Sequence, residues 1–239
     1  MRKNLRVSVE RAARALLVPA VCAAAAPLAQ AEPAYNAVTV SDGVLLTPSL
    51  SVEQRFDDNI FITEENEVDS PITEVAPAAN LRLRMAPGST IDFSYAGEYG
   101  FYWDSTDDNY DDHRAQVDAR FEGSRRVSVS GYLAYELEHD NRGTGPSNGF
   151  GPATTATFDE PTTYDQFMGG AQLNLGAQDI STIRGELAVD YSDREYDEVI
   201  ATVGGDTFDI VADRNNQITT YRATGFYQVA PSTEVLAEY

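Results

Sequence analysis

The chain has almost no cysteine and almost no lysine. Cys22 and Lys3 are the only residues of their kinds among 239, and both lie in the first 31 residues. This segment has the features of a secretory signal: a basic start, an apolar run, and Ala29-Gln30-Ala31 as an A-x-A cleavage site. We expect cleavage after Ala31. The exported remainder would have no cysteine, so disulfides are excluded and backbone pairing and burial must stabilise it.

Long hydrophobic runs are also missing. The longest one, from Ala15 to Ala26, is interrupted by Pro19. It falls short of the roughly 20 apolar residues that a membrane-spanning helix needs. No later segment is longer, so the sequence predicts no spanning helix.

Positive charge is scarce. After residue 31 the chain has 37 acidic residues against 12 basic ones, all of them arginines, which gives a formal charge of −25. Such a chain is an implausible partner for nucleic acid. Acidic chains poor in lysine are also typical of salt-adapted organisms, so the bulk charge reports on environment more than on chemistry.

The chain does have a sustained alternation of apolar and polar residues. The segments 81–85, 91–95, 115–121 and 127–133 all show it. A period of two predicts β-strands with unlike faces. Because one face has Arg and Asp while the other has Leu, Val, Phe and Tyr, we expect these strands to separate water from lipid.

Nine strands are expected. Their ranges are 48–56, 75–85, 90–103, 113–122, 127–138, 164–175, 181–192, 218–229 and 234–239. Tight links alternate with long loops at about 57–74, 104–112, 139–163 and 193–217. Short turns inside and long loops outside are typical of an outer-membrane barrel. The sequence therefore predicts an all-β protein: a transmembrane antiparallel up-and-down β-barrel over 48–239, preceded by a periplasmic segment at 32–47.

The four long loops are acidic. They hold 22 of the 37 acidic residues, and their only basic residues are Arg142, Arg194 and Arg214. We interpret them as a solvated anionic rim.

The polar strand face is predicted to line the lumen. Its candidate residues are Arg82, Arg84, Asp92, Glu98, Arg114, Asp118, Arg120, Glu136, Arg184, Glu186 and Arg222. A shift of register by one residue would turn each arginine toward lipid at a cost of about 2–4 kcal/mol near the midplane, which fixes the face assignment. The arginines have two interpretations: ordinary pairing with acids, or guanidinium groups that escort an anionic sugar polymer.

The apolar face should meet lipid, and aromatic residues gather near its strand ends, especially from Tyr99 to Trp103. An aromatic girdle at the membrane interface is one explanation, and the general enrichment of aromatics in strands is the other.

The number of strands raises a question. Nine strands would leave the C-terminus outside, whereas such barrels usually have an even number of strands. We expect a C-terminally truncated chain, with an eight-stranded barrel as the alternative.

Two sets of polar residues are candidates for chemical sites. Weak candidates for Ca²⁺ ligands are Asp104, Asp107, Asp108, Asp111 and Asp112. They do not fit the spacing of an EF-hand loop, and charged loop residues exposed to solvent are the better explanation. His113 and His139 are the only histidines, and no nucleophile with an orienting partner accompanies them. We expect no enzyme activity and no cofactor.

Five phrases of the chain resemble a known family. They are Phe56-Asp57-Asp58-Asn59-Ile60-Phe61, Ser70-Pro71-Ile72-Thr73-Glu74-Val75-Ala76-Pro77, Tyr95-Ala96-Gly97-Glu98-Tyr99-Gly100-Phe101-Tyr102, Asn109-Tyr110-Asp111-Asp112-His113 and His139-Asp140-Asn141-Arg142-Gly143. The chain is similar, over about residues 45 to 145, to outer-membrane β-barrel proteins of a porin type encoded among exopolysaccharide and capsule synthesis genes.

The resemblance implies a role in polysaccharide export or surface assembly, in the outer membrane of a Gram-negative bacterium, with lipid and an anionic polysaccharide as partners. Two alternatives stay open. One is a structural or adhesive outer-membrane protein with cation-binding acidic loops, and the other is a secreted carbohydrate-binding β-sandwich.

Overall fold

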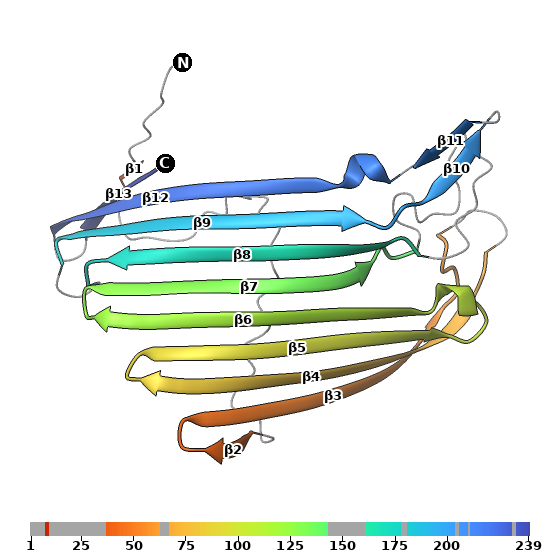
Figure 1. The fold of residues 1–239 in the computed structure, drawn as a ribbon, viewed down its shortest axis with the longest axis horizontal. Coiled ribbons are helices and arrows are strands. Elements are labelled where there is room, and N and C mark those ends of the chain that lie inside the picture. Colours follow the sequence, from red (N-terminus) through yellow and green to blue (C-terminus); the bar gives the residue numbers. More distant parts are fainter. Residues whose placement is uncertain are drawn as a thin grey trace.

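The fold is one long antiparallel sheet. The computed structural model describes residues 8–9, 37–62, 67–142, 161–177, 181–203, 206–209, 211–230 and 233–239. Eleven strands pair in the order β1-β13-β12-β9-β8-β7-β6-β5-β4-β3-β2, so almost every strand lies beside its neighbour in the sequence (Figure 1). Within these residues the two ends of the sheet do not pair with each other. The same residues include no helix with the length and apolar character needed to span a bilayer.

The long strands match the nine that the sequence predicts. They are β3 (Val44–Asp57), β4 (Ser70–Ala86), β5 (Ser89–Tyr102), β6 (Tyr110–Ser124), β7 (Val127–His139), β8 (Thr163–Leu175), β9 (Ile183–Tyr196), β12 (Asn216–Ala230) and the short β13 (Thr233–Glu238). The all-β, up-and-down prediction is confirmed. The β-sandwich alternative is wrong, because a sandwich needs two large facing sheets and the described strands form one large sheet and a two-stranded hairpin.

Several short elements were not predicted. β2 (Val38–Ser41) pairs with β3, so the sheet begins within the range 32–47. β10 (Ile200–Val203) and β11 (Asp206–Asp209) form a separate hairpin inside the loop after β9. Two 3-10 turns, η1 (Thr106–Asp108) and η3 (Ala212–Arg214), shape the loops before β6 and β12.

The predicted signal lies outside the described residues, apart from β1 (Ser8–Val9), which pairs with β13. Cys22 and the cleavage position Ala31 are among the residues not described. Cleavage of the signal therefore stays a prediction.

The register places like residues in rows across the strands. One row joins Leu81 to Phe93, Phe93 to Val117, and Val117 to Leu133. The adjacent row joins Arg82 to Asp92, Asp92 to Asp118, and Asp118 to Tyr132. Successive residues of a strand point to opposite faces, so these rows lie on opposite sides of the sheet.

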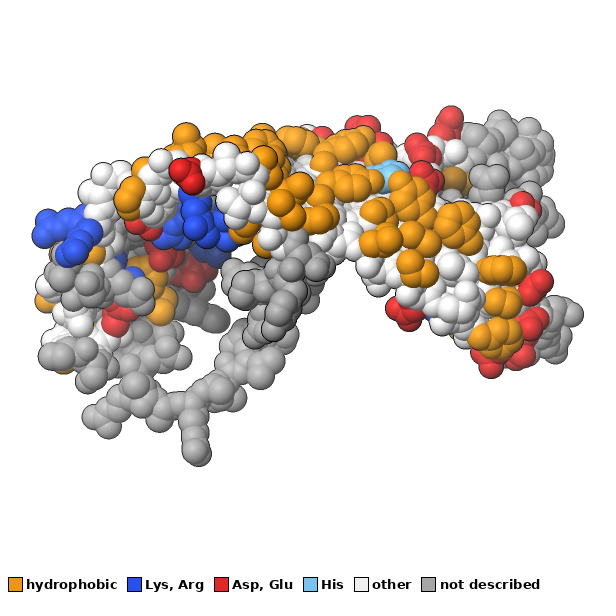
Figure 2. Space-filling view, turned by 90° about the horizontal axis from the view of Figure 1, so that it is seen from below, with side chains coloured by type: hydrophobic (Ala, Val, Ile, Leu, Met, Phe, Trp, Pro, Cys, Tyr) orange, Lys and Arg blue, Asp and Glu red, His pale blue; other side chains and the backbone are white. Residues whose placement is uncertain are grey.

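The sheet is arched, and hydrophobic side chains cover its convex surface while charged side chains lie beneath the arch (Figure 2). Large apolar side chains on the outer face are well exposed: Leu133 is 58% exposed, Ile183 71% and Tyr221 75%. The residues with complete burial, such as Ile72 and Val211, lie elsewhere, at the loop end. A soluble protein would not leave its strands uncovered in this way.

Tight turns gather at one end of the strands and long loops at the other (Figure 1). The β4–β5 turn uses Gly88 with a φ of 76°, a conformation that costs glycine little because it has no Cβ. The opposite end, where the loops meet, holds the apolar clusters described below.

Candidate functional site: the inner face and the loop end

Most arginines of the inner face have an acidic partner. Arg82 Nε lies 2.6 Å from Asp92 Oδ1, and Arg120 Nη2 lies 3.0 Å from Glu122 Oε1. Arg184 binds both carboxylate oxygens of Glu234, at 2.6 and 2.8 Å. The remaining pairs are Arg222 with Asp190 at 3.6 Å and Arg114 with Glu136. Among the described residues Arg84 makes no ion pair.

A row of polar residues crosses the inner face from β6 to β9: the register aligns Arg114, Glu136, Gln166 and Arg194. Glu136, which is buried, pairs with Arg114, and the neighbouring Gln166 Oε1 accepts hydrogen bonds from Arg194 Nε and Nη2 at 2.9 and 2.6 Å. Arg194 also lies over the ring of Tyr164, 4.3 Å from the ring centroid. The ion pair keeps the buried Glu136 charge from being alone, although Arg114 Nε and Glu136 Oε1 are buried without a hydrogen-bond partner among the described residues.

Tyr132 lies across a glycine on the same face. Its row partner on β8 is Gly170, and Gly170 in turn pairs with Asp190. A Cβ at Gly170 would come within 2.5 Å of Tyr132 Cε1 and 2.6 Å of Asp190 Oδ1. The ring therefore occupies the space that a side chain would take, beside an open hollow of about 290 Å³ lined by Asp92, Asp118, Arg120 and Arg222.

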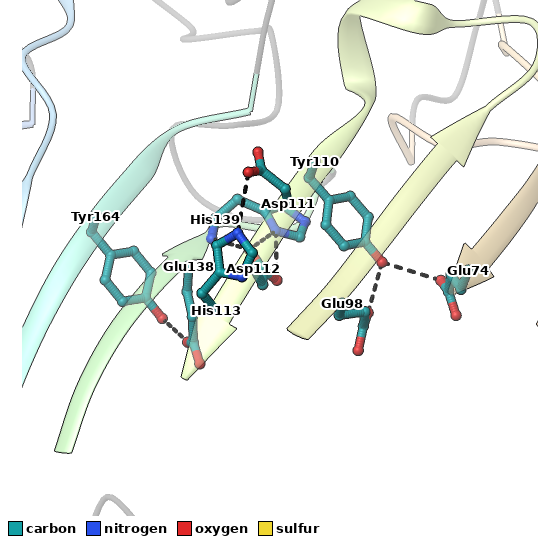
Figure 3. Close-up of polar contacts among 9 residues, drawn as sticks. All are labelled: Glu74, Glu98, Tyr110, Asp111, Asp112, His113, Glu138, His139 and Tyr164. Carbon is teal, nitrogen blue, oxygen red and sulfur yellow. Dashed lines mark hydrogen bonds and ion pairs between the residues drawn. The ribbon is translucent and has the colours of Figure 1, made fainter. Parts of the chain in front are cut away.

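Near the loop end, Tyr110 connects two carboxylates. Its hydroxyl donates to Glu98 Oε1 at 2.7 Å and reaches Glu74 Oε1 at 3.3 Å (Figure 3). Arg55 Nε lies 2.8 Å from the same Glu74 oxygen and balances part of this charge. On the neighbouring strands, the Tyr164 hydroxyl donates to Glu138 at 2.5 Å.

The two histidines also have partners. His139 Nδ1 lies 2.9 Å from Asp112 Oδ1, and its ring stacks on Tyr110 with 3.9 Å between centroids. His113 Nε2 lies 3.3 Å from Asp111 Oδ2, and its Nδ1 lies 2.8 Å from the Tyr95 hydroxyl. Among the residues that the structure describes, no serine, threonine or cysteine side chain is hydrogen-bonded to either ring. In the described part of the chain, the only hydroxyl bonded to a histidine ring is therefore that of Tyr95.

The loop after β7 is tied to the loop between β5 and β6. Arg142 Nε pairs with Asp108 Oδ1, and both side chains are almost fully buried. The Ser105 hydroxyl also donates to Asp108, and the Arg142 guanidinium lies 5.3 Å from the centroid of the Phe61 ring. Beside this pair, Ile60, Ile72 and Tyr102 form a small apolar cluster.

The same loop is tied on its other side to the segment before β12. Arg214 Nη1 pairs with Asp140, and its Nη2 donates to the Tyr196 hydroxyl at 2.7 Å. Burial disfavours the charged form of Arg214, but the hydrogen bond and charge of Asp140 outweigh it and raise the pKa of the guanidinium. Tyr164, Tyr196 and Val211 form a second apolar cluster here. Arg142 and Arg214, two of the three arginines in the acidic loops, thus join three loops together.

The profile of the family described as Putative beta-barrel porin 2 matches residues 32–239. The chain belongs to this family. It is an outer-membrane β-barrel protein, as the resemblance in its sequence implied. No curated protein and no solved structure matches it.

The acidic loops of this barrel protein do not assemble a metal site in the described residues. No group of three or more His, Cys, Asp or Glu side chains with suitable geometry occurs there. The five candidates are Asp104, Asp107, Asp108, Asp111 and Asp112. Two of them have other partners: Asp108 pairs with Arg142, and Asp112 pairs with His139. Calcium binding therefore stays a prediction, and two of the proposed ligand carboxylates, those of Asp108 and Asp112, already pair with other side chains.

The structure brings most of the predicted lumen residues together. Ion pairs on one face include Arg82, Asp92, Arg114, Glu136, Arg120 and Arg222. On the same face, the Asp118 carboxylate accepts hydrogen bonds from Gln116 at 2.8 and 2.9 Å, and Glu98 accepts one from the Tyr110 hydroxyl. Sequence reasoning missed the contributions of Tyr110, Tyr164 and Gln166. The contacts of Arg142 and Arg214 were also missed, although isolated cations in acidic loops were a usable indication of ion pairs.

Proposed function

We propose that the protein is a non-catalytic conduit for the export or surface assembly of exopolysaccharide at the outer membrane. The observation that carries this proposal is the inner face: a strongly polar strand surface on which charges of both signs lie together and most arginines pair with acids. The resemblance of residues 45–145 to barrels encoded among polysaccharide synthesis genes supports the same role.

A paired inner face suits a sugar polymer that must move. Hydroxyl groups exchange hydrogen bonds readily with the Tyr, Gln and Asp side chains that lie there. Arginines that already pair with acids bind an anionic polymer only weakly, so it can move past them. Transport requires binding that is favourable enough to admit the substrate and weak enough to release it.

The role is tested by deleting the gene and measuring secreted polysaccharide. We expect a marked loss of secreted polymer, restored by the wild-type gene. Normal secretion by the deletion strain would overturn the proposal.

The contribution of the inner face is tested with Arg82, Arg84 and Arg120 replaced together by Gln. Arg114 is left in place because its removal would leave the buried Glu136 without its partner. We expect lower secretion with an unchanged heat-modifiable gel shift, which reports the folded barrel. Full secretion by a folded variant would show that these three arginines do not contribute to polymer passage.

Cation-dependent adhesion is the second candidate function, and the acidic rim is the observation that favours it. It predicts that the deletion strain secretes normally but adheres poorly in the presence of Ca²⁺. The same strain therefore distinguishes the two roles.

A further inference from the structure

Arginine is concentrated at the turn end of the strands. Arg120, Arg125, Arg126 and Arg184 line an open hollow of about 690 Å³ there, together with Glu122 and Glu186. This lining has an excess of positive charge in a chain whose formal charge is strongly negative. The hollow is thus a positively charged region in a protein whose overall charge is negative.

The hollow is built by two turns held against each other. Gly176 N donates to the Arg126 carbonyl at 2.7 Å, which fixes the β6–β7 turn beside the end of β8. Arg126 N also donates to Ser124 Oγ at 3.2 Å within its own turn. The turn that presents Arg125 and Arg126 is therefore supported by one backbone–backbone hydrogen bond and one from a backbone N–H to a serine hydroxyl.

Two of the four arginines have no acidic partner among the described residues. Arg120 pairs with Glu122, and Arg184 pairs with Glu234. Arg125 and Arg126 make no ion pair with any described residue, and both are exposed. They are the lining cations best placed to receive a ligand's negative charge.

The loop end has the opposite charge. The long loops contain most of the acidic residues. Their arginines Arg142 and Arg214 already form ion pairs, with Asp108 and Asp140 respectively. In Figure 2 the basic side chains lie toward the turn end, with some acidic ones among them, whereas acidic side chains lie around the loops without basic ones beside them. An anion approaching the inner face is therefore attracted at the turn end and repelled at the loop end.

We propose that this hollow is the site where an anionic glycan first binds, through carboxylate groups held by Arg125 and Arg126. The proposal rests on the export function above and specifies its substrate class and the end from which the substrate is taken up. Guanidinium groups bind carboxylates with paired hydrogen bonds. Ser128, Gln172 and Asn174 also line the hollow and offer neutral partners to sugar hydroxyls.

The test measures binding of a trimer of galacturonate, an acidic sugar, to the purified protein in nanodiscs of zwitterionic lipid. Maltotriose is the neutral comparison. The variant is Arg125→Gln/Arg126→Gln, and the control is Arg55→Gln, which removes a positive charge at the loop end. We expect the wild type to prefer the acidic trimer, at least tenfold weaker binding by the double variant, and a change within twofold for the control. Added salt should weaken the wild-type binding, because it screens exposed charges.

Equal binding of both sugars, or an acidic trimer that binds the double variant as well as the wild type, would overturn the proposal. Anionic phospholipid headgroups carry a similar charge, so the measurement is repeated in nanodiscs containing phosphatidylglycerol. If the double variant binds the acidic trimer normally and differs from the wild type only in its association with that lipid, the arginines bind headgroups and the glycan site is wrong.

The failures of the two proposals are distinguishable. Selective trimer binding that the double variant loses, combined with normal secretion by the deletion strain, would retain the site and reject the export function. Loss of secretion on deletion, combined with trimer binding that the double variant keeps, would retain the function and reject the site.

Discussion

The strands and the loop end bury their apolar side chains in different ways. On the outer face of the strands, Leu133, Ile183 and Tyr221 stay more than half exposed. At the loop end, Ile72 and Val211 are completely buried in clusters that the protein makes by itself. Both regions are rich in apolar residues, and only one of them has its own core.

This difference indicates which medium surrounds each region. The strands leave burial to lipid, which covers the outer face once the barrel is inserted. The loops stand in water, so they must remove their apolar groups from solvent themselves. Changes to the loop clusters should therefore behave as changes to a soluble core, and changes to the outer face should depend on the bilayer.

The largest effect is expected from the buried ion pair of the loop end. Arg142→Met leaves Asp108 charged and buried without its partner, at a cost of about 3–5 kcal/mol in unfolding free energy. The measurement is denaturant unfolding in lipid vesicles, supported by proteolysis of the loops. The double variant Arg142→Met/Asp108→Leu should recover much of the loss, because no buried charge remains. A loss below 1 kcal/mol in the single variant would show that this pair is open to water.

A matched pair of isoleucines compares the two regions directly. Ile72→Ala should leave a cavity and cost about 2–5 kcal/mol. Ile183→Ala removes the same atoms from the outer face, where acyl chains fill the space, so its cost should be clearly smaller. Both values come from unfolding in the same vesicles. Equal losses would contradict the assignment of separate media.

A charge placed on the strands tests the two faces. Leu133→Arg puts a guanidinium on the outer face and should cost about 2–4 kcal/mol near the bilayer midplane. Ser130→Arg, on the inner face of the same strand, should change stability by no more than about 0.5 kcal/mol, as is usual for surface sites. The comparison is made by vesicle unfolding, and a reversed order would mean that the faces are exchanged.

The smallest effect concerns the glycine beneath Tyr132. Gly170→Ala places a methyl group against the Tyr132 ring and Asp190, and we expect a loss of about 1–3 kcal/mol. Gly225→Ala is the control, because nothing lies within 4 Å of its added Cβ. That control should be neutral or slightly stabilising, since alanine restricts the unfolded chain. If both variants behave alike, the ring does not rest on Gly170.

The sequence predicted the strands and their faces well, because a period of two is a local property that lipid enforces on every strand. It located Arg82, Asp92, Arg114 and Glu136 on one face, and the register then paired them. Pairing itself depends on which strands are neighbours, and short turns make sequential strands adjacent.

The loop end was harder to predict. The contact of Arg142 with Asp108 joins residues 34 positions apart, through loops whose course no periodicity describes. The β10–β11 hairpin was missed for a similar reason, because four-residue strands within an acidic loop give too short an alternation to recognise.

The central claim is that the outer strand face contacts lipid. Because the predicted mature chain has no cysteine, single cysteines can be introduced along β7 and labelled with a fluorophore in vesicles of brominated lipid. The account predicts strong quenching of labels at Leu133→Cys and Val129→Cys and weak quenching at Ser130→Cys and Ser128→Cys. Equal quenching at all four positions would contradict it. So would a protein that stays folded in plain buffer and whose labels remain unquenched when the brominated vesicles are added.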